Sequence, residues 1–200
     1  MTFNRAPYNN REHSREHKEV PQEKKEEFAI VLDVVFSNQN SFKSDEIAQA
    51  IGTTNYTLLE LVPKPGVILK TLQKVYIGDG KRDEIQYIKR SLFSDKMSSG
   101  AKSELSYAIR EIVLERESEY VEFFNKAGPI SIRMHSLELI PGIGKKHMLD
   151  LLHEREKKPF ESFEDIKVRC TFFSDPAKAI VDRVIMELDA KDDMKIFVRK

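Results

Sequence analysis

The chain turns a corner at Leu137-Glu138-Leu139-Ile140-Pro141-Gly142-Ile143-Gly144-Lys145-Lys146, and this stretch decides the fold of its second half. An apolar helical segment runs into Pro-Gly-Ile-Gly, and a new helix is expected to begin with two lysines. Glycine lacks a Cβ atom, so the turn can take unusual dihedrals and another backbone can approach it closely. The first N–H groups of a helix have no intrahelical partner and carry partial positive charge. The stretch therefore favours a bound anion.

This pattern resembles the helix-hairpin-helix motif of nucleic-acid-binding proteins. The resemblance implies phosphate contacts that position a nucleic acid without reading its sequence. The predicted contact residues are Gly142, Ile143, Gly144, Lys145, Lys146 and His147. Arg133 and His135 precede the hairpin and either reach a phosphate or sugar beside it or brace the domain. The alternative is a structural turn that only holds two helices together or contacts protein.

Helical patterns surround this corner. We expect helices over residues 101–126, 131–140, 145–156, 163–169 and 176–188. The first is one long amphipathic helix that ends at Gly128-Pro129. Ser162 and Asp175 are good N-caps for the last two. The connection between these two has no glycine and no basic pair, so we predict that it supports the fold and does not touch phosphate.

Residues 28–97 are predicted to form a small β-barrel, because short β-branched segments alternate there with tight turns. Strands are expected over 28–36, 56–62, 73–77 and 84–93, and a short helix over 44–51. Gly78-Asp79-Gly80 predicts a hairpin between the last two strands. An oligonucleotide-binding (OB) fold is the first choice and an SH3-like barrel the second. A final strand over 194–198 is expected to return and pair with the barrel.

The fold class is therefore α+β. The predicted domains are a disordered charged tail over 1–27, an OB-like or SH3-like barrel over 28–97, an all-helical domain with the helix-hairpin-helix over 98–192, and a terminal strand over 193–200. The tail carries six basic and six acidic side chains and few apolar ones. Such a segment cannot bury enough surface to offset its ordering entropy.

The composition limits the class of protein. The formal net charge is zero, so any surface that binds a polyanion must be local. The single cysteine, Cys170, excludes an internal disulfide framework and favours a reducing, cytoplasmic setting; we expect it to fill a small space in the core. The longest apolar run, residues 28–36, is too short to span a bilayer, so no membrane partner is expected.

A second basic surface is predicted in the barrel. Residues 63–92 hold seven Lys or Arg against three Asp or Glu. Its candidate nucleic-acid contacts are Lys64, Lys81, Arg82, Lys89 and Arg90. Tyr76 and Tyr87 lie among them and could stack on bases, although alternating aromatic residues in strands are more often part of a core.

We find no catalytic signature, so we do not expect an enzyme, a cofactor or a metal site. Asp150 and Asp165 follow the hairpin, where helix-hairpin-helix glycosylases carry a catalytic Asp, but neither lies in a copy of that signature. His13 and His17 have the spacing of two metal ligands on a helix face, yet they lie in the predicted tail without a further ligand.

The resemblance reaches beyond the hairpin. Three runs carry it: Phe123 to Pro129, Arg133 to Lys146, and Lys158 to Ile166. Together they resemble an uncharacterised archaeal family with a small OB-like barrel followed by a helix-hairpin-helix domain, over roughly residues 28–198. The resemblance implies a cytoplasmic protein and supports the architecture more than the activity.

The predicted function is nucleic-acid binding through phosphate contacts that do not depend on sequence. RNA is favoured over DNA, by analogy with RNA-handling proteins that join a barrel to a hairpin domain. The alternative is a protein-interaction scaffold in the translation or transcription machinery, with ribosomal or transcription proteins as partners and no direct nucleic-acid contact. The net neutrality favours this alternative.

Overall fold

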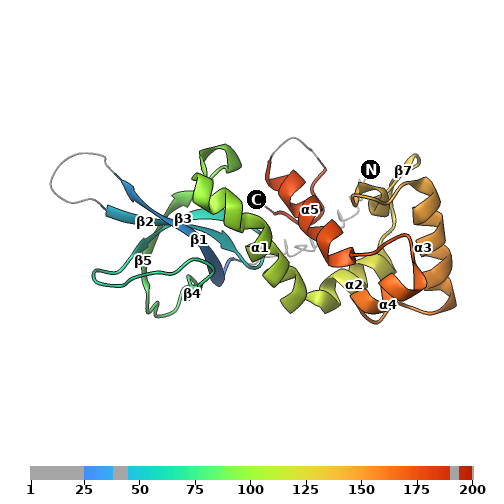
Figure 1. The fold of residues 1–200 in the computed structure, drawn as a ribbon, viewed down its shortest axis with the longest axis horizontal. Coiled ribbons are helices and arrows are strands. Elements are labelled where there is room, and N and C mark those ends of the chain that lie inside the picture. The colour runs from blue at the N-terminus through green and yellow to red at the C-terminus, as the bar shows by residue number, and fades with distance from the viewer. Residues whose placement is uncertain (1–24, 38–44, 190–193, 200) are drawn as a thin grey trace, which may run out of the picture.

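The computed structural model describes residues 25–37, 45–189 and 194–199. It is a mixed α+β structure in which a curled antiparallel sheet occupies one end of the long axis and helices the other (Figure 1). The predicted tail falls outside the described residues up to residue 24. Residues 25–27 are fixed to the sheet: the carboxylate of Glu26 accepts hydrogen bonds from the amides of Thr54 and Asn55 at 2.7 and 2.9 Å.

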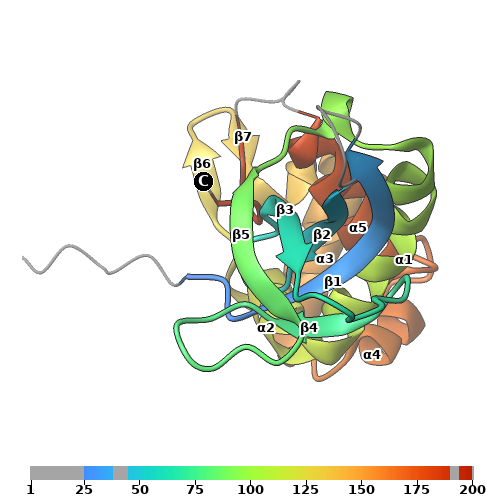
Figure 2. The ribbon, with the colours of Figure 1, turned by 90° about the vertical axis from the view of Figure 1, so that its left-hand side faces the viewer.

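The sheet has the strand order β4-β1-β2-β3-β5. Its strands are β1 (Phe28–Ser37), β2 (Asp45–Gly52), β3 (Leu58–Pro63), β4 (Lys74–Tyr76) and β5 (Ile85–Ser91). Every pairing is antiparallel, and β4 and β5 form the two edges. The sheet curls into a half-barrel, as Figure 2 shows.

Both faces of the curled sheet are buried, which explains the continuous apolar run of β1. Ala29 and Val31 pack into a cluster on one face, with residues of β2, β3, β4 and β5. Ile30 and Leu32 point to the opposite face and pack into the larger cluster that includes the helices. A strand that is buried on both sides does not alternate apolar and polar residues.

Two sequence predictions for the sheet are wrong. Residues 45–52 form strand β2 and not a helix, because β1 and β3 pair with it on either side. Gly78-Asp79-Gly80 does not join a hairpin: β4 pairs with β1, and β5 pairs with β3. The connection after β4 therefore crosses from one edge of the half-barrel to the other.

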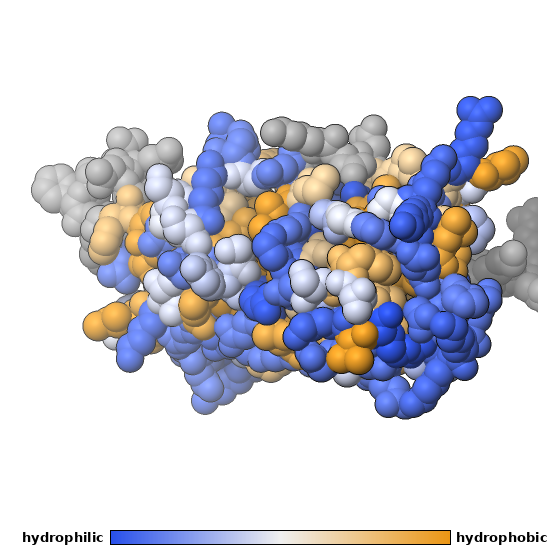
Figure 3. All heavy atoms as spheres, turned by 45° about the vertical axis from the view of Figure 1, so that its right-hand side comes forward, coloured by the Kyte–Doolittle hydropathy of each residue, from blue (hydrophilic) through white to orange (hydrophobic). Residues whose placement is uncertain are grey.

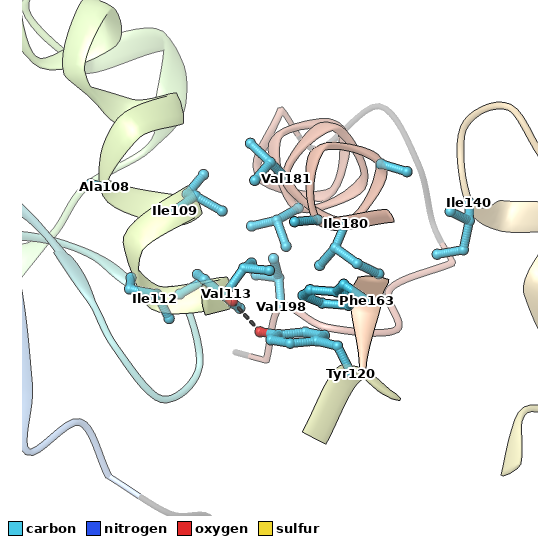
Figure 4. Close-up of a cluster of buried hydrophobic side chains, with 14 of the residues drawn as sticks. Ala108, Ile109, Ile112, Val113, Tyr120, Ile140, Phe163, Ile180, Val181 and Val198 are labelled. Atoms are coloured by element: carbon cyan, nitrogen blue, oxygen red, sulfur yellow. Dashed lines mark hydrogen bonds between the residues drawn. The ribbon is translucent and has the colours of Figure 1, made fainter. Parts of the chain in front are cut away.

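The helices pack against one face of the sheet and against each other. They are α1 (Ser99–Glu115), α2 (Glu117–Lys126), α3 (Lys145–Lys157), α4 (Phe163–Arg169) and α5 (Pro176–Leu188). Helix α1 contacts β1 and β2 on one side and α5 on the other, so it links the sheet to the rest of the helices. Figure 4 shows the apolar side chains of α1 and α5 meeting here, among them Ile109, Ile112 and Ile180.

The predicted long helix over 101–126 is two helices, broken at Arg116. The break has no glycine or proline. Instead, the guanidinium of Arg116 donates to the carbonyl oxygens of Thr53 and Thr54 at 2.8 and 3.0 Å, across the interface with the sheet. Next to it, the hydroxyl groups of Tyr56 and Tyr120 form a buried hydrogen bond, drawn in Figure 4.

The predicted helix over 131–140 is wrong, and the second half of the chain is not all-helical. Residues 129–139 form a small β-hairpin, β6 (Pro129–Ser131) with β7 (Met134–His135), and a short 3-10 helix, η2 (Ser136–Leu139). A second 3-10 helix, η1 (Ser94–Lys96), precedes α1. The predicted helices over 163–169 and 176–188 are confirmed with the same bounds.

The expected terminal strand does not form in residues 194–199. The amides of Ile196, Phe197 and Val198 donate to the carboxylate of Glu187 in α5, at 3.0, 2.9 and 2.8 Å. These donors are therefore not available for a ladder with the sheet. Across the described parts of the chain, no helix is both long enough and apolar enough to cross a membrane.

Candidate functional site

The turn between η2 and α3, residues 140–144, contains Gly142 and Gly144 and is called the glycine corner below. Two buried isoleucines anchor it. Ile140 and Ile143 lie in the large apolar cluster, and the amide of Ile143 donates to the carbonyl of Ile140 at 3.0 Å. Between them, Gly142 has a φ of +87°, a left-handed conformation that glycine takes without strain. The anchors hold the turn in place while Gly142 and Gly144 face solvent. Ile143 can therefore contact a ligand only through its backbone.

The first turn of α3 presents unpaired amides. Its N-cap is Gly144, which has no side chain to accept a hydrogen bond, and the first intrahelical bond runs from the amide of Met148 to the carbonyl of Gly144 at 2.9 Å. Within the described part of the chain, no hydrogen bond takes up the amides of Lys145, Lys146 or His147. Together with the helix dipole, these groups give the corner a positive potential.

The corner is open to a ligand. A Cβ atom built at Gly142 or at Gly144 would meet no heavy atom within 4 Å. The turn lines an open groove of about 710 Å³. Lys145 and Lys146 lie on its rim, exposed, and neither forms an ion pair with any described residue. Figure 3 turns this end of the molecule forward and shows a largely hydrophilic surface with hydrophobic groups scattered over it.

The imidazole of His147 is fixed at the same corner. Its Nδ1 lies 3.0 Å from the carbonyl oxygen of Gly142, and its ring stacks on Phe172 with a centroid distance of 4.2 Å and an interplanar angle of 10°. These two contacts hold the ring against the turn. His147 therefore also stabilises the conformation of the glycine corner.

Arg133 and His135 have different surroundings. Arg133 is exposed at the tip of the β6–β7 hairpin. His135 caps η2: its Nδ1 accepts from the amide of Leu137 at 3.2 Å, and Glu138 accepts from the amide of His135 at 2.9 Å. Burial, followed by the positive charge of Arg155, lowers the pKa of His135 below its ordinary value, so its neutral form is favoured. These contacts support a structural role for His135.

Sequence reasoning missed two side chains that α5 contributes to the groove, Arg183 and Met186. They lie far from the hairpin in sequence, and no local pattern marks them. Glu138 also lines the groove, and its capping contact with His135 could have been found from their three-residue spacing.

Most cations of the second basic surface already have partners. Arg90 donates to the buried carboxylate of Glu60 at 2.8 and 3.0 Å. Lys64 donates to the carbonyl of Arg82, and Arg82 donates through Nε to the carbonyl of Gly78 at 3.0 Å. Lys81 and Lys89 are exposed, and among the described residues neither has an ion-pair partner.

The two tyrosines of this surface differ. Tyr76 is partly buried: its ring packs edge-on against Phe28, and its hydroxyl accepts from the amide of Gly80 at 3.0 Å. Tyr87 is 48% exposed on β5, so it is not a core residue. Figure 1 places β5 near one end of the long axis and α3 near the other, so the two basic surfaces do not merge.

The carboxylates after the hairpin have structural contacts or are solvated. Asp165 accepts from Arg169 and from the amide of Glu161, both at 3.1 Å, and Asp150 is exposed on α3. No cluster of three or more His, Cys, Asp or Glu that could hold a metal ion occurs in the described ranges. His13 and His17 lie outside those ranges.

The protein is therefore a mixed α+β protein of two halves. Helix α1 joins a half-barrel sheet to a helical half that carries the open glycine corner. The chain belongs to the DUF655 family, described as proteins of unknown function, through a match over residues 25–199. It is 40% identical over 184 residues to the uncharacterised protein MJ0038 of Methanocaldococcus jannaschii, covering 91% of this chain and 83% of that protein.

A solved structure shares the fold. The crystal structure of Af1531 from Archaeoglobus fulgidus, also of the DUF655 family, is 40% identical and superposes with a TM-score of 0.80, covering 87% of this chain and 100% of that one. The predicted kinship with an uncharacterised family that has archaeal members is thereby confirmed.

Proposed function

We propose that this protein binds nucleic acid, with RNA favoured over DNA, through phosphate contacts at residues 142–147. In this proposal η2, the glycine corner and α3 act as a helix-hairpin-helix, and the half-barrel is OB-like. A cytoplasmic setting belongs to the same proposal. The observation that carries it is the open corner, where three unpaired amides of α3 adjoin two exposed lysines that have no acidic partner among the described residues.

The chemistry of the corner suits a phosphate diester. Amides at a helix N-terminus donate to anionic oxygens, and the ammonium groups of Lys145 and Lys146 add charge without a fixed geometry. Because both glycines leave open space, a phosphate can approach the backbone itself. Such contacts read no base, so affinity is expected to depend on salt more than on sequence.

The barrel surface supports this proposal less. Arg90 is neutralised by Glu60, and Lys64 and Arg82 bond to backbone carbonyls. Lys81, Lys89 and the exposed ring of Tyr87 remain for an additional contact. We therefore assign the main affinity to the glycine corner and only a supporting contribution to β5.

The test is fluorescence anisotropy with a labelled RNA stem-loop and a DNA duplex of equal length. Contacts to two phosphates predict that affinity falls about tenfold between roughly 50 and 200 mM salt. Lys145→Glu with Lys146→Glu should remove most of the binding. The matched control is Lys70→Glu with Lys102→Glu, which changes the net charge equally at two exposed lysines elsewhere.

The outcomes separate the proposal from the scaffold alternative. Loss of binding in the first double variant, with binding kept in the control, supports the phosphate site. Equal binding by the first double variant and the parent contradicts it. Absence of binding to both nucleic acids at low salt favours the scaffold, for which the net neutrality is the supporting observation.

A further inference from the structure

The β6–β7 hairpin has an unusual tip. Ser131 pairs with Met134, so Ile132 and Arg133 form the two-residue connection. Neither residue has a positive φ, so this connection does not need the Asn or Gly of the common hairpin turns. A β-branched apolar residue and a long cation stand there, and Ile132 is fully exposed, at 106% of its reference area. An isoleucine at a tip where it adds nothing to the core suggests a function.

The base of this hairpin is firmly held. The amide and the hydroxyl of Ser136 both donate to the carbonyl of Gly128, at 3.0 and 2.8 Å. The capping contacts of His135 fix the start of η2 directly after the hairpin. The pairing is irregular between Pro129 and Ser131, and such irregularities redirect the side chains around them. The tip therefore projects from a fixed base.

A short segment joins the tip to the glycine corner. Strand β7 contacts η2, and η2 in turn contacts α3, which begins at the corner. Arg133, Lys145 and Lys146 are exposed, and none of them has an ion-pair partner in the described residues. An apolar tip with its own cation, on the segment that leads to two further uncompensated cations, fits a polyanion that also offers an apolar surface. Nucleic acid with an accessible base has both properties.

We propose that the tip formed by Ile132 and Arg133 contacts an unpaired base at a bulge or loop of a structured RNA, while the corner at 142–146 holds a neighbouring phosphate. This inference rests on the proposed function and specifies its substrate. Bases in a continuous RNA helix are stacked and their faces are covered, whereas an unpaired base can be splayed out and stack on a guanidinium plane. Ile132 would cover the rest of that base and lose its own contact with water.

The experiment compares two RNA stem-loops of equal length, one fully paired and one with a single unpaired 2-aminopurine in the stem. The full chain should bind the bulged RNA at least about fivefold more tightly, the ratio expected for partial burial of one isoleucine. The fluorescence of the 2-aminopurine in the bulged RNA should change when the protein binds. Ile132→Ser should reduce the affinity ratio to below about twofold. The control is Ile68→Ser, an isoleucine that is 84% exposed in the β3–β4 connection and should leave the ratio unchanged.

The results also separate this inference from the proposed function. Suppose that the parent binds the two RNAs with equal affinity, and that the Lys145→Glu, Lys146→Glu double variant binds neither RNA. This result overturns the inference about the tip and still supports the phosphate site. An unchanged ratio in Ile132→Ser also overturns it. Failure of the parent to bind either RNA overturns both. Because Ile132 contacts no core residue, thermal unfolding of Ile132→Ser should match the parent, which shows that a lost ratio does not reflect misfolding.

Discussion

Arg183 Nε lies 2.7 Å from Glu187 Oε1 within the protein interior, where both side chains are almost fully shielded from water. The same carboxylate accepts the three amides of residues 196–198. The guanidinium also donates to the carbonyls of Leu139 and Met194. One buried ion pair in α5 thus joins the end of η2, beside the glycine corner, to residues 194–198.

We predict that Glu187→Ala lowers the free energy of unfolding by about 3–5 kcal/mol, because it removes the acidic partner of a buried ion pair and the acceptor of three amides. Urea denaturation followed by circular dichroism measures the loss. The matched control is Asp182→Ala, which breaks the exposed Lys178–Asp182 pair at the same spacing on the same helix and should cost less than about 1 kcal/mol. Similar losses in the two variants would contradict the role assigned to Glu187.

Gly142 supplies a second stability prediction. At its φ of +87°, a Cβ atom is strained although no neighbour lies within 4 Å, so the cost of Gly142→Ala is conformational. We expect a loss of about 1–2 kcal/mol. Gly128→Ala is the control, since Gly128 also has open space but no positive φ, and it should leave stability unchanged or raise it by up to about 1 kcal/mol. A neutral Gly142→Ala would show that the corner relaxes to another conformation.

The buried hydroxyl pair predicts a loss of stability at alkaline pH. Burial, followed by the proximity of Tyr120, raises the pKa of Tyr56 far above its ordinary value, and burial also raises the pKa of Tyr120. The native state therefore keeps these protons above about pH 10, where the unfolded chain loses them. Stability is fully present below that pH and falls as the pH rises through it.

Chemical denaturation at about pH 9 and pH 11 tests this prediction. Tyr56→Phe with Tyr120→Phe should lose less stability between the two pH values than the parent does. Tyr107→Phe removes a tyrosine that is 64% exposed and should behave as the parent. An equal alkaline loss in the double variant would assign the effect to other groups.

Cys170 gives a prediction about reactivity. The side chain is buried, as expected from the sequence, and burial together with the negative charge of Glu154 raises the pKa of its thiol to about 11. Because the thiolate is the nucleophile, the native protein should resist a thiol-specific disulfide reagent at about pH 8 and react fully once unfolded in urea. Complete labelling of the native protein within seconds would contradict the burial.

The sequence predicts the start of a helix correctly where a capping side chain lies next to it. The side chain of Ser162 accepts from the amide of Asp165 at 3.0 Å, and that of Asp175 accepts from Lys178 at 2.8 Å. These caps lie within three residues of the helices they begin, so the sequence alone reveals α4 and α5. The start of α3 after Gly144 also has a local signal, which is the Pro-Gly-Ile-Gly turn and not a capping side chain.

The errors share a different cause, because distant contacts decide those segments. Ile47, Ala48 and Ile51 have helical spacing, yet residues 45–52 are a strand because β1 and β3 lie on both sides. The break at Arg116 depends on carbonyls of the sheet. At the candidate site, the exposed corner follows from its own residues, whereas the neutralisation of Arg90 by Glu60 depends on how β5 pairs with β3.

The helices share one apolar core with β1, β2 and β3, so the positions of β5 and the start of α3 are fixed relative to each other along the long axis (Figure 1). A rigid protein of this kind sets a fixed distance between its two basic surfaces. A polymer bound at both β5 and the start of α3 would need a minimum length set by that distance, whatever the sequence of the polymer. A fragment shorter than that span would engage one end at a time and lose the gain in affinity that comes from joining two weak contacts.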